Sequence, residues 1–465
     1  MSEKTKADIL KEELFYNPSN AFNVCNEKET DKAMKFCEGY IDFLNACRTE
    51  REVNSFVKAQ AVKKGYKEFD RAAKYKAGDK VYFDIHGKAL ILTTFGKKSV
   101  KNGTKIVAAH IDSPRLDLKP NPLYEDEELG YFKTHYYGGI KKYQWPTVPL
   151  ALHGVICKRD GTTVTVRIGD AEGDPRFVIT DLLPHLDRED RSIRKAIAGE
   201  DLNILIGSRP FGNEKGDKLV KLNLMKILNE KYGIKEEDFL TAELEAVPAY
   251  PAVDIGFDRS LIGSYGHDDR VCAYPAVMAE FDIKKPEYTT VTVITDKEET
   301  GSDGNTGLHS AFLKQYISDL AALAGVPGRD VLRASECLSA DVNAGYDPTF
   351  SSVFEKNNSA FLNRGIVVTK YTGSGGKGST NDANAEFVSK VATVFDKSGT
   401  VWQTGELGKV DVGGGGTVAK YVANLGVNVV DVGVPVLSMH APFEIVAKMD
   451  VYMAYKGFKA FAQGK

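Results

Sequence analysis

The stretch Thr290–Ser302, with the sequence TVTVITDKEETGS, indicates the fold class of this chain. Its first half is a run of β-branched and apolar residues, which predicts a strand buried on both faces. The run stops at Asp296, and Glu298 and Glu299 follow before Gly301 turns the chain. Acids at the carboxyl end of a strand are typical of active sites in open α/β sheets. Two adjacent carboxylates can divide the work, because one holds a cation while the other moves a proton. A solvated acidic loop is the alternative for this stretch alone.

A second apolar run ends in residues of the same chemical type. Residues 106–109 predict a buried strand within KIVAAHIDSPRLDLKP, and His110 and Asp112 lie at its exit. Residues two apart in an extended chain point to the same side. Asp112 can therefore orient the histidine or a shared water instead of binding the same ion. On its own, this His-x-Asp pattern is a weak signal for a metal site.

Three further segments supply candidate metal ligands. Asp268 and Asp269 open an apolar segment of helical character, where N-capping is the alternative role. A short strand ends at His440, which a hydrogen-bonded core histidine would also explain, and Asp341 and Asp347 lie in a loop that contains glycine. Imidazole and carboxylate groups in this number suit two closely spaced divalent ions such as zinc, cobalt or manganese. One carboxylate can then bridge the ions, and a spare glutamate is left as a base.

These segments resemble the M18 family of metalloaminopeptidases, the group that contains aspartyl aminopeptidase and yeast vacuolar aminopeptidase I. The matching pieces occur in the family's order and cover most of the chain. They are AAHIDSPRLDLKP (Ala108–Pro120), YGGI followed by W (Tyr137–Trp145), GHDDRVCA (Gly266–Ala273), DKEETGS (Asp296–Ser302), SADVNAGYDP (Ser339–Pro348) and SMHAPFE (Ser438–Glu444).

The resemblance implies a role for each matching position. Asp268 is implied to bridge the metal ions, Glu298 to be the general base, and Asp112 to be the acid that orients the site. Asp269 occupies the neighbouring position, where related enzymes carry Asp or Asn, so a shift of the bridge by one residue is the alternative. The implied metal ligands are His110, Asp268, Glu299, Asp341 and His440.

The implied function is a dinuclear metal-dependent aminopeptidase that removes N-terminal residues from peptides. Two divalent ions per subunit, most simply zinc with cobalt or manganese as options, would activate a water that bridges them. Glu298 would take the proton of that water and return it to the leaving nitrogen. Two other functions stay open. One is a related metal-dependent amide hydrolase, such as a deacylase or a carboxypeptidase, and the other is a non-enzymatic assembly or cargo protein on the same fold.

The order of the expected elements indicates two domains. Residues 1–122 and 249–465 alternate strand and helix patterns, which predicts an α/β catalytic domain with a doubly wound mixed sheet of the zinc-peptidase type. Within it, the pattern predicts an amphipathic helix around residues 33–44 and a hairpin over Val81–Phe95. Residues 123–248 are rich in strand patterns and Gly/Pro turns and hold no clear metal ligand. We interpret them as an inserted β-rich oligomerisation domain.

One histidine of the inserted domain is implied to act in a neighbouring subunit. M18 enzymes resemble one another in supplying such a histidine and in forming tetrahedral dodecamers. His185 follows a proline in LLPHLDRED and resembles that residue, with His153 as the competing assignment. A histidine held there could stabilise the oxyanion of the reaction, whereas an interface histidine without chemistry is the alternative. The resemblance therefore implies a homododecamer.

Two glycine-rich segments bear on substrate preference. Neither Gly373–Asp382 nor Val412–Thr417 has the spacing of a phosphate-binding loop. Lys377 in the first segment is the candidate substrate-binding cation, because an acid-preferring branch of the M18 family uses a basic residue in this region. A solvated loop lysine is the alternative. The run Gly413–Gly416 departs from the family pattern, so an acidic or a neutral preference stays open.

Composition narrows the class of protein. The chain has 465 residues and a formal net charge of -3, which argues against a nucleic-acid-binding protein. Its six cysteines are scattered without a CxxC pair, as in reduced proteins of the cytosol. The first residues have no apolar signal core, and no apolar run is long enough to cross a bilayer. We therefore expect a cytoplasmic protein with peptide substrates and no membrane or nucleic-acid partner.

Overall fold

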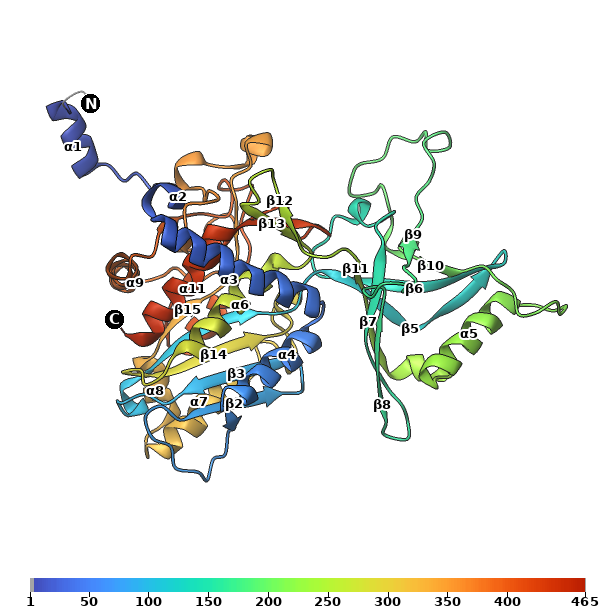
Figure 1. Cartoon of the computed structure of the whole chain (residues 1–465), viewed down its shortest axis with the longest axis horizontal. Helices are drawn as coiled ribbons and strands as arrows, with labels where there is room; N and C mark the ends of the chain where they lie inside the picture. Colours follow the sequence, from blue (N-terminus) through green and yellow to red (C-terminus); the bar gives the residue numbers. More distant parts are fainter. Residues whose placement is uncertain (1–3, 465) are drawn as a thin grey trace.

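The computed structural model describes residues 4–464. Figure 1 shows an α/β domain that carries both ends of the chain and, beside it, a second domain built mainly of long strands. The first helix, α1 (Lys6–Leu14), has no buried residue and extends away from the α/β domain (Figure 1).

The α/β domain is built on a nine-stranded mixed sheet. Its strand order is β1-β2-β3-β14-β4-β15-β19-β17-β18. Strands β14, β4, β15 and β19 are parallel neighbours, whereas β3 and β17 run antiparallel to the strands beside them in that block. The strands are β1 (Lys67–Glu68), β2 (Lys80–Ile85), β3 (Ala89–Thr94), β4 (Thr104–His110), β14 (Thr289–Thr295), β15 (Glu336–Ser339), β17 (Ile366–Thr369), β18 (Trp402–Thr404) and β19 (Asn428–Gly433).

Helices cover both faces of this sheet. Successive side chains of a strand point to opposite faces, so on β4 Ile106 and Ala108 enter one core while Val107 and Ala109 enter the other. This double burial explains why the strands are continuous apolar runs instead of alternating ones, and it confirms the expected α/β class. One face packs against α3 (Glu27–Ala46), α4 (Glu50–Lys63), α6 (His267–Asp282), α9 (Ala385–Ser398) and α11 (Lys448–Gln463), and the other against α7 (Phe312–Leu323), α8 (Gly328–Ala334) and α10 (Ala419–Ala423).

Two local predictions in this domain are confirmed. Strands β2 and β3 form an antiparallel hairpin, with Ile85 paired to Ala89 across the turn. The expected amphipathic helix lies within α3, whose buried side includes Tyr40, Phe43 and Leu44. Helix α3 begins after Asn26, whose side chain accepts a hydrogen bond from a backbone N–H of the first turn, as N-cap residues do.

The second domain is a seven-stranded sheet inserted between β4 and the later strands of the α/β domain. Its order is β8-β7-β11-β5-β6-β10-β9, and it has its own apolar core around Trp145. Strand β5 begins at Arg115, so this sheet starts before the expected boundary at residue 123. The elements are β5 (Arg115–Asp126), β6 (Leu129–Tyr137), β7 (Leu150–Cys157), β8 (Thr163–Ile168), β9 (Val178–Ile179), β10 (Ile204–Gly207), α5 (Leu219–Tyr232) and β11 (Ala242–Pro248).

A third, five-stranded sheet is made of short strands in the order β12-β13-β21-β20-β16. It joins segments that are far apart in the sequence, because β13 pairs antiparallel with β21 and β20 pairs parallel with β16. Its loops carry several of the candidate ligands described below. The strands are β12 (Val253–Ile255), β13 (Leu261–Ser264), β16 (Asn343–Ala344), β20 (Pro435–Leu437) and β21 (Glu444–Ala447).

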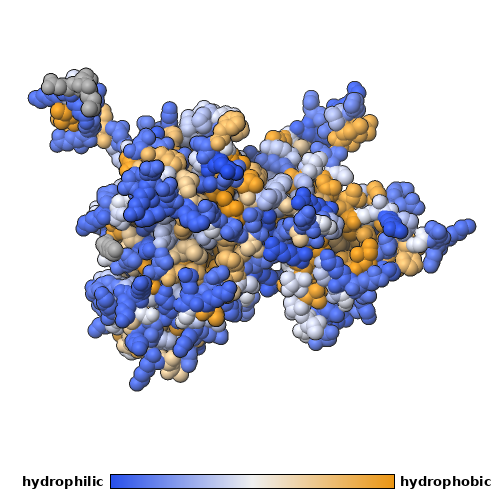
Figure 2. Space-filling model, viewed as in Figure 1, coloured by the Kyte–Doolittle hydropathy of each residue, from blue (hydrophilic) through white to orange (hydrophobic). Residues whose placement is uncertain are grey.

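None of the helices within residues 4–464 is long and apolar enough to cross a membrane. All six cysteines lie in this range, and all are free thiols. Figure 2 shows apolar atoms exposed on the seven-stranded-sheet domain, where the exposed large apolar side chains include Leu186, Ile193 and Leu240.

Candidate active site

Three parallel strands deliver candidate ligands to one edge of the central sheet. His110 is the last residue of β4, Glu298 and Glu299 form a short 3-10 turn after β14, and Asp341 follows β15. Strand β4 lies between β14 and β15, so the chain crosses from one side of β4 to the other when it passes from β14 to β15. Ligands bind at such a switch point, beyond the carboxyl ends of the strands, in open α/β folds.

The five-stranded sheet supplies the remaining two candidate ligands. Asp268 lies in the first turn of α6, directly after β13, and His440 lies in the loop between β20 and β21. Oδ1 of Asp268 is 3.1 Å from Nε2 of His110, and Oδ2 is 3.2 Å from Nε2 of His440. Each oxygen of this carboxylate thus faces a different histidine, which is the arrangement that a carboxylate bridging two ions requires.

The carboxylates of Asp341, Glu298 and Glu299 also lie close to the Nε2 atoms of these two histidines. Oδ1 of Asp341 is 3.8 Å and Oε2 of Glu298 is 4.0 Å from Nε2 of His110, whereas Oε2 of Glu299 is 3.6 Å from Nε2 of His440. Three sets of side chains have ligand atoms within 4.8 Å of one another, close enough to share an ion. They are His110 with Glu298 and Asp341, His110 with Asp268 and Glu299, and Asp268 with Asp269 and Asp341.

The charges in this cluster are not balanced by lysine or arginine. Within residues 4–464, only histidines lie within ion-pair distance of Asp268, Glu298, Glu299 and Asp341. Burial raises the pKa of the Glu299 and Asp341 carboxyls well above their usual range. Oε1 of Glu299 and Oδ2 of Asp341 are buried and have no hydrogen-bond partner. Because buried anions need a compensating charge, this donor set fits divalent cations.

The side chains of the two adjacent aspartates face different groups. Oδ2 of Asp269 accepts a hydrogen bond of 3.3 Å from the backbone N–H of His110, and its other oxygen is unpaired. Asp269 therefore faces the end of β4, and Asp268 is the one that lies between the histidines. Asp347, the remaining loop aspartate, caps a 3-10 turn by accepting from the N–H of Thr349.

Asp112 and Glu444 accept hydrogen bonds from backbone N–H groups of the candidate site residues. Oδ1 and Oδ2 of Asp112 accept hydrogen bonds of 3.1 Å from the N–H groups of Glu298 and Glu299, respectively. Glu444 accepts from the N–H of His440 at 2.7 Å and from the N–H of Asp268 at 3.1 Å. Burial raises the pKa of the Glu444 carboxyl to about 8. Sequence reasoning quoted Glu444 within a motif but gave it no role. Both of its partners are backbone N–H groups, and Asp268 is far from it along the chain.

Glu298 faces the cavity in which a substrate can be accommodated. This cavity has a volume of about 590 Å³, and its wall includes Asp268, Glu299, Asp341 and His440 together with the glycines 414–416. Burial raises the pKa of the Glu298 carboxyl to about 7, which is the range in which a carboxylate both accepts and releases a proton near neutral pH.

Comparison with known proteins shows the family of this chain. A sequence model of the family described as "Aminopeptidase I zinc metalloprotease (M18)" matches residues 43–462. The chain belongs to the M18 family. It is 48% identical to a protein of Clostridium acetobutylicum named "Probable M18 family aminopeptidase 1", with 98% of this chain and 99% of that protein covered. A homologue of the same name from Thermotoga maritima is 43% identical and covers 95% and 98%, respectively.

Solved M18 structures share the fold. The crystal structure of an M18 aminopeptidase from Thermotoga maritima superposes with a TM-score of 0.93 at 42% identity and covers 97% of this chain and 100% of that one. Aminopeptidase I from Clostridium acetobutylicum gives a TM-score of 0.91 at 45% identity, with 97% and 100% covered. A structure of the S. cerevisiae mApe1 dodecamer, at 21% identity and a TM-score of 0.74 with 94% and 97% covered, shares the fold alone. The M18 resemblance of the sequence is thereby confirmed, and this chain is a metal-dependent aminopeptidase.

The two candidates for the shared histidine of this M18 aminopeptidase, His185 and His153, lie outside the metal-ligand cluster. His185 is exposed in the inserted domain, in a segment without regular secondary structure. His153 is fully buried, with Nδ1 2.8 Å from Glu52 and Nε2 3.0 Å from Asp170. Its ring therefore offers no surface to a neighbouring subunit, which leaves His185 as the exposed candidate of the two.

Lys377 lies in a cavity beside the one that Glu298 faces. Its ammonium is 3.0 Å from Oδ2 of Asp382 and 3.7 Å from the ring centre of Tyr371. A different lysine, Lys420 on α10, lines the cavity of the metal-ligand cluster. Sequence reasoning missed Lys420, because it follows the glycine-rich run as an ordinary residue of a short helix.

Proposed function

We propose that this M18 aminopeptidase holds two divalent metal ions per subunit, most simply zinc, and uses Glu298 as the general base of peptide hydrolysis. His110, Asp268, Glu299, Asp341 and His440 would be the ligands, with Asp268 bridging the two ions. The observation that carries this proposal is the position of the Asp268 carboxylate, whose two oxygens lie 3.1 and 3.2 Å from the Nε2 atoms of His110 and His440.

The donor set suits zinc, and also cobalt or manganese. Neutral imidazoles and carboxylates are the usual ligands of these ions, and Nδ1 of each histidine is engaged, which leaves Nε2 for an ion. Nδ1 of His110 lies 3.1 Å from the carbonyl oxygen of Asp112, and Nδ1 of His440 lies 2.8 Å from that of Gly139. Such contacts fix the tautomer and the ring orientation of metal-binding histidines.

In the proposed reaction Glu298 moves the proton. When bound, the ions would lower the pKa of the attacking water and polarise the scissile carbonyl. Glu298 accepts a proton from the water and returns it to the nitrogen of the leaving peptide. Asp112 keeps the Glu298 carboxylate in place by accepting a hydrogen bond from its backbone N–H. The cavity wall at Leu407 and Met439 accommodates the side chain of the first residue.

We further propose that the subunits form a closed oligomer, a dodecamer in analogy to the S. cerevisiae mApe1 dodecamer. Support comes from exposed apolar side chains around His185, since Leu182, Leu183 and Leu186 are about half exposed or more. Apolar side chains of this number in one short segment favour contact with another surface. In the assembly, His185 would enter the active site of the partner subunit and stabilise the oxyanion.

Lysines near the cavity support a preference for acidic first residues. The sequence points to Lys377, but its ammonium already pairs with Asp382. Lys420 lines the cavity of the metal-ligand cluster, and within residues 4–464 it forms no ion pair with a carboxylate. We therefore rank Lys420 before Lys377 as the cation that would receive a substrate carboxylate. The six free thiols suit a reducing compartment, and we propose a cytoplasmic location.

A direct test combines metal analysis with a panel of amide substrates. The protein is stripped with a chelator, reloaded with zinc, cobalt or manganese, and measured on fluorogenic aminoacyl amides with free or acetylated amino groups. We expect about two ions per subunit and hydrolysis only of the free amines. Equal rates on acetylated substrates would favour the deacylase-type alternative, and a preparation that binds metal but stays inactive would favour an assembly or cargo role.

A further inference from the structure

The end of strand β6 reaches from the inserted domain into the metal-ligand cluster. Three successive residues at this point contact three residues of the site. The hydroxyl of Tyr137 donates a hydrogen bond of 2.7 Å to Oδ2 of Asp112, and the carbonyl oxygen of Gly139 lies 2.8 Å from Nδ1 of His440. Gly138, between them, has a φ of +73° and lies so close to Glu299 that an added Cβ would be 3.2 Å from Cβ of the glutamate.

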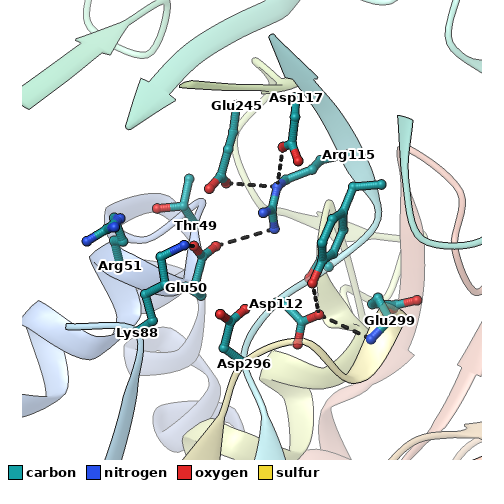
Figure 3. Close-up of polar contacts among 12 residues, drawn as sticks. Thr49, Glu50, Arg51, Lys88, Asp112, Arg115, Asp117, Glu245, Asp296 and Glu299 are labelled. Atoms are coloured by element: carbon teal, nitrogen blue, oxygen red, sulfur yellow. Dashed lines mark hydrogen bonds and ion pairs between the residues drawn. The ribbon is translucent and has the colours of Figure 1, made fainter. Parts of the chain in front are cut away.

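The buried carboxylate of Asp112 accepts several hydrogen bonds. Its Oδ2 accepts from both the hydroxyl of Tyr137 and the N–H of Glu299, and its Oδ1 accepts from the N–H of Glu298. Figure 3 shows the contact between Asp112 and Glu299. The side chain of Asp112 is fully buried. The orientation of this carboxylate therefore sets where the turn of Glu298 and Glu299 lies, and Tyr137 is a side-chain donor that fixes this orientation.

Tyr137 is itself held by a buried arginine. The guanidinium of Arg115, the first residue of β5, lies 4.0 Å from the ring centre of Tyr137. A cation over an aromatic face attracts the ring, and more strongly when water is excluded. Both side chains are almost completely buried, so the ring of Tyr137 cannot turn its hydroxyl away from Asp112 without leaving this contact.

Arg115 is fixed by carboxylates from both domains. Its Nη1 is 3.3 Å from Glu50 of α4, and its Nε is 3.2 Å from Glu245 of β11 and 2.8 Å from Asp117 (Figure 3). Removing one partner of such a buried charge group leaves the others uncompensated. The cluster thus joins the inserted domain to the α/β domain directly behind the active site.

We infer that Tyr137 is a positioning residue for the reaction, and that the inserted domain acts on catalysis within its own subunit through the contacts of Tyr137 with Asp112 and Arg115. This inference rests on the proposed role of Glu298. The catalytic carboxylate must be held within about 0.5 Å of its productive position, and Tyr137 restrains it through Asp112. The inserted domain is therefore part of the active site of its own chain, in addition to any part in assembly.

The test is Tyr137→Phe in the full-length, metal-loaded protein. This variant keeps the ring beside Arg115 and removes only the hydroxyl. We expect kcat to fall about 10- to 100-fold, the range for loss of a hydrogen bond that orients a ligand or a base, with KM, metal content and oligomer size unchanged. The matched control is Tyr136→Phe, since Tyr136 is the preceding residue on β6 and is exposed. An unchanged kcat in Tyr137→Phe would overturn the inference.

A double-mutant cycle separates positioning from a general loss of structure. If Tyr137 acts through Asp112, Tyr137→Phe should have little further effect on kcat in the Asp112→Asn background. Additive effects, or a loss of bound metal in proportion to kcat, would overturn the inference. The activity of the wild type alone tests the proposed function. The ratio of the kcat of the variant to the kcat of the wild type tests this inference. An inactive, fully loaded wild type would reject both, whereas an active wild type with an unchanged variant would reject only the inference.

Arg115 provides a second, independent variant. Arg115→Lys keeps the positive charge among Glu50, Glu245 and Asp117 but removes the planar group beside Tyr137. We expect kcat to fall in the same direction as in Tyr137→Phe, with little further loss when both changes are combined. If Arg115→Lys fails to fold, the Tyr137→Phe cycle still decides the inference. A folded Arg115→Lys protein with wild-type kcat would show that the arginine does not contribute to positioning.

Discussion

The backbone N–H of Glu298 donates a hydrogen bond of 3.1 Å to Oδ1 of Asp112. Glu298 follows β14, and Asp112 lies two residues beyond His110 at the end of β4. The hydrogen bond therefore ties the turn that carries the proposed base to the strand that carries a proposed ligand. Because β14 and β4 are parallel neighbours, a small movement of either strand end would change the position of the base relative to the ions.

Changing each of the two adjacent glutamates to glutamine should affect metal content and kcat differently. We expect Glu298→Gln to keep both ions and to lose at least about 10²-fold in kcat, the usual scale for a general base. Glu299→Gln should lose metal as well, because the Glu299 carboxylate lies 3.6 Å from His440 and has an unpaired buried oxygen. Metal content and kcat of both purified variants are the measurement. Equal metal loss in the two variants would contradict this division of roles.

A partner-supplied histidine should be detectable by mixing inactive subunits. His185→Ala should lower kcat without changing the mass of the oligomer, because His185 is exposed and makes no side-chain contact with the metal-ligand cluster of its own chain. Co-assembly with Glu298→Gln subunits in equal amounts should return activity to about a quarter of the sites, those that combine an intact Glu298 with an intact partner histidine.

The control for this experiment is His135→Ala, since His135 is also an exposed histidine of the inserted domain. It should leave kcat and oligomer size at wild-type values. Light scattering gives the mass of each particle, which should be near twelve times 51.0 kDa for the wild type. A stable monomer at micromolar concentration would reject both the dodecamer and the shared histidine.

The sequence could predict the sheet and the strand-end residues because both have a local signature. The β-branched run before Asp296 and the run before His110 are apolar at successive positions, which is what a strand covered on both faces requires. These strands are parallel neighbours in the structure. It follows that polar residues at the ends of both strands lie at the same edge of the sheet, as expected from the pattern.

The contacts that hold the site in place have no such signature. Glu444 orders the loop of His440 and the first turn of α6 from a five-stranded sheet whose strands are two to four residues long, too short to show a period. The carbonyl of Gly139 and the ring of His440 are separated by 301 residues. Tyr137 lies at the end of a strand of the inserted domain, in which the sequence shows no clear metal ligand, so its hydrogen bond to Asp112 could not be predicted.

The two lysines near the cavity should differ in their effect on substrate preference. We expect Lys420→Ala to lower kcat/KM for aspartyl and glutamyl substrates by about 10-fold or more and to leave leucyl and methionyl substrates nearly unchanged. Lys377→Ala should have a smaller effect on the acidic substrates, because Asp382 already pairs with that ammonium. The measurement is kcat/KM for each variant on the four substrates. A wild type that prefers neutral first residues, or variants that affect all substrates alike, would reject the acidic preference.

His153 should make the stability of the protein depend on pH. Burial alone would lower the pKa of His153, but its hydrogen bonds to Asp170 and Glu52 outweigh burial and raise the pKa above the ordinary 6.5. A raised pKa in the folded state means that the protonated ring stabilises the fold. This contribution is complete below pH 6.5 and is lost as the pH rises through the folded-state pKa. His153→Gln should therefore destabilise the protein more at pH 6 than at pH 9.

The loss of stability expected for His153→Gln follows from the two carboxylates that His153 contacts. Glu52 belongs to α4 of the α/β domain, whereas His153 and Asp170 belong to the inserted domain, so His153→Gln leaves two partly buried carboxylates without the donor that they share. Such a loss costs about 1–3 kcal/mol. Urea midpoints of wild type and variant at the two pH values measure it.

The control is His86→Asn, since His86 is exposed in the β2–β3 turn with a φ of 54°, which asparagine also adopts. A stability difference for His153→Gln that is the same at both pH values would contradict the raised pKa, because it would mean that the ring binds its second proton equally well in the folded and the unfolded protein.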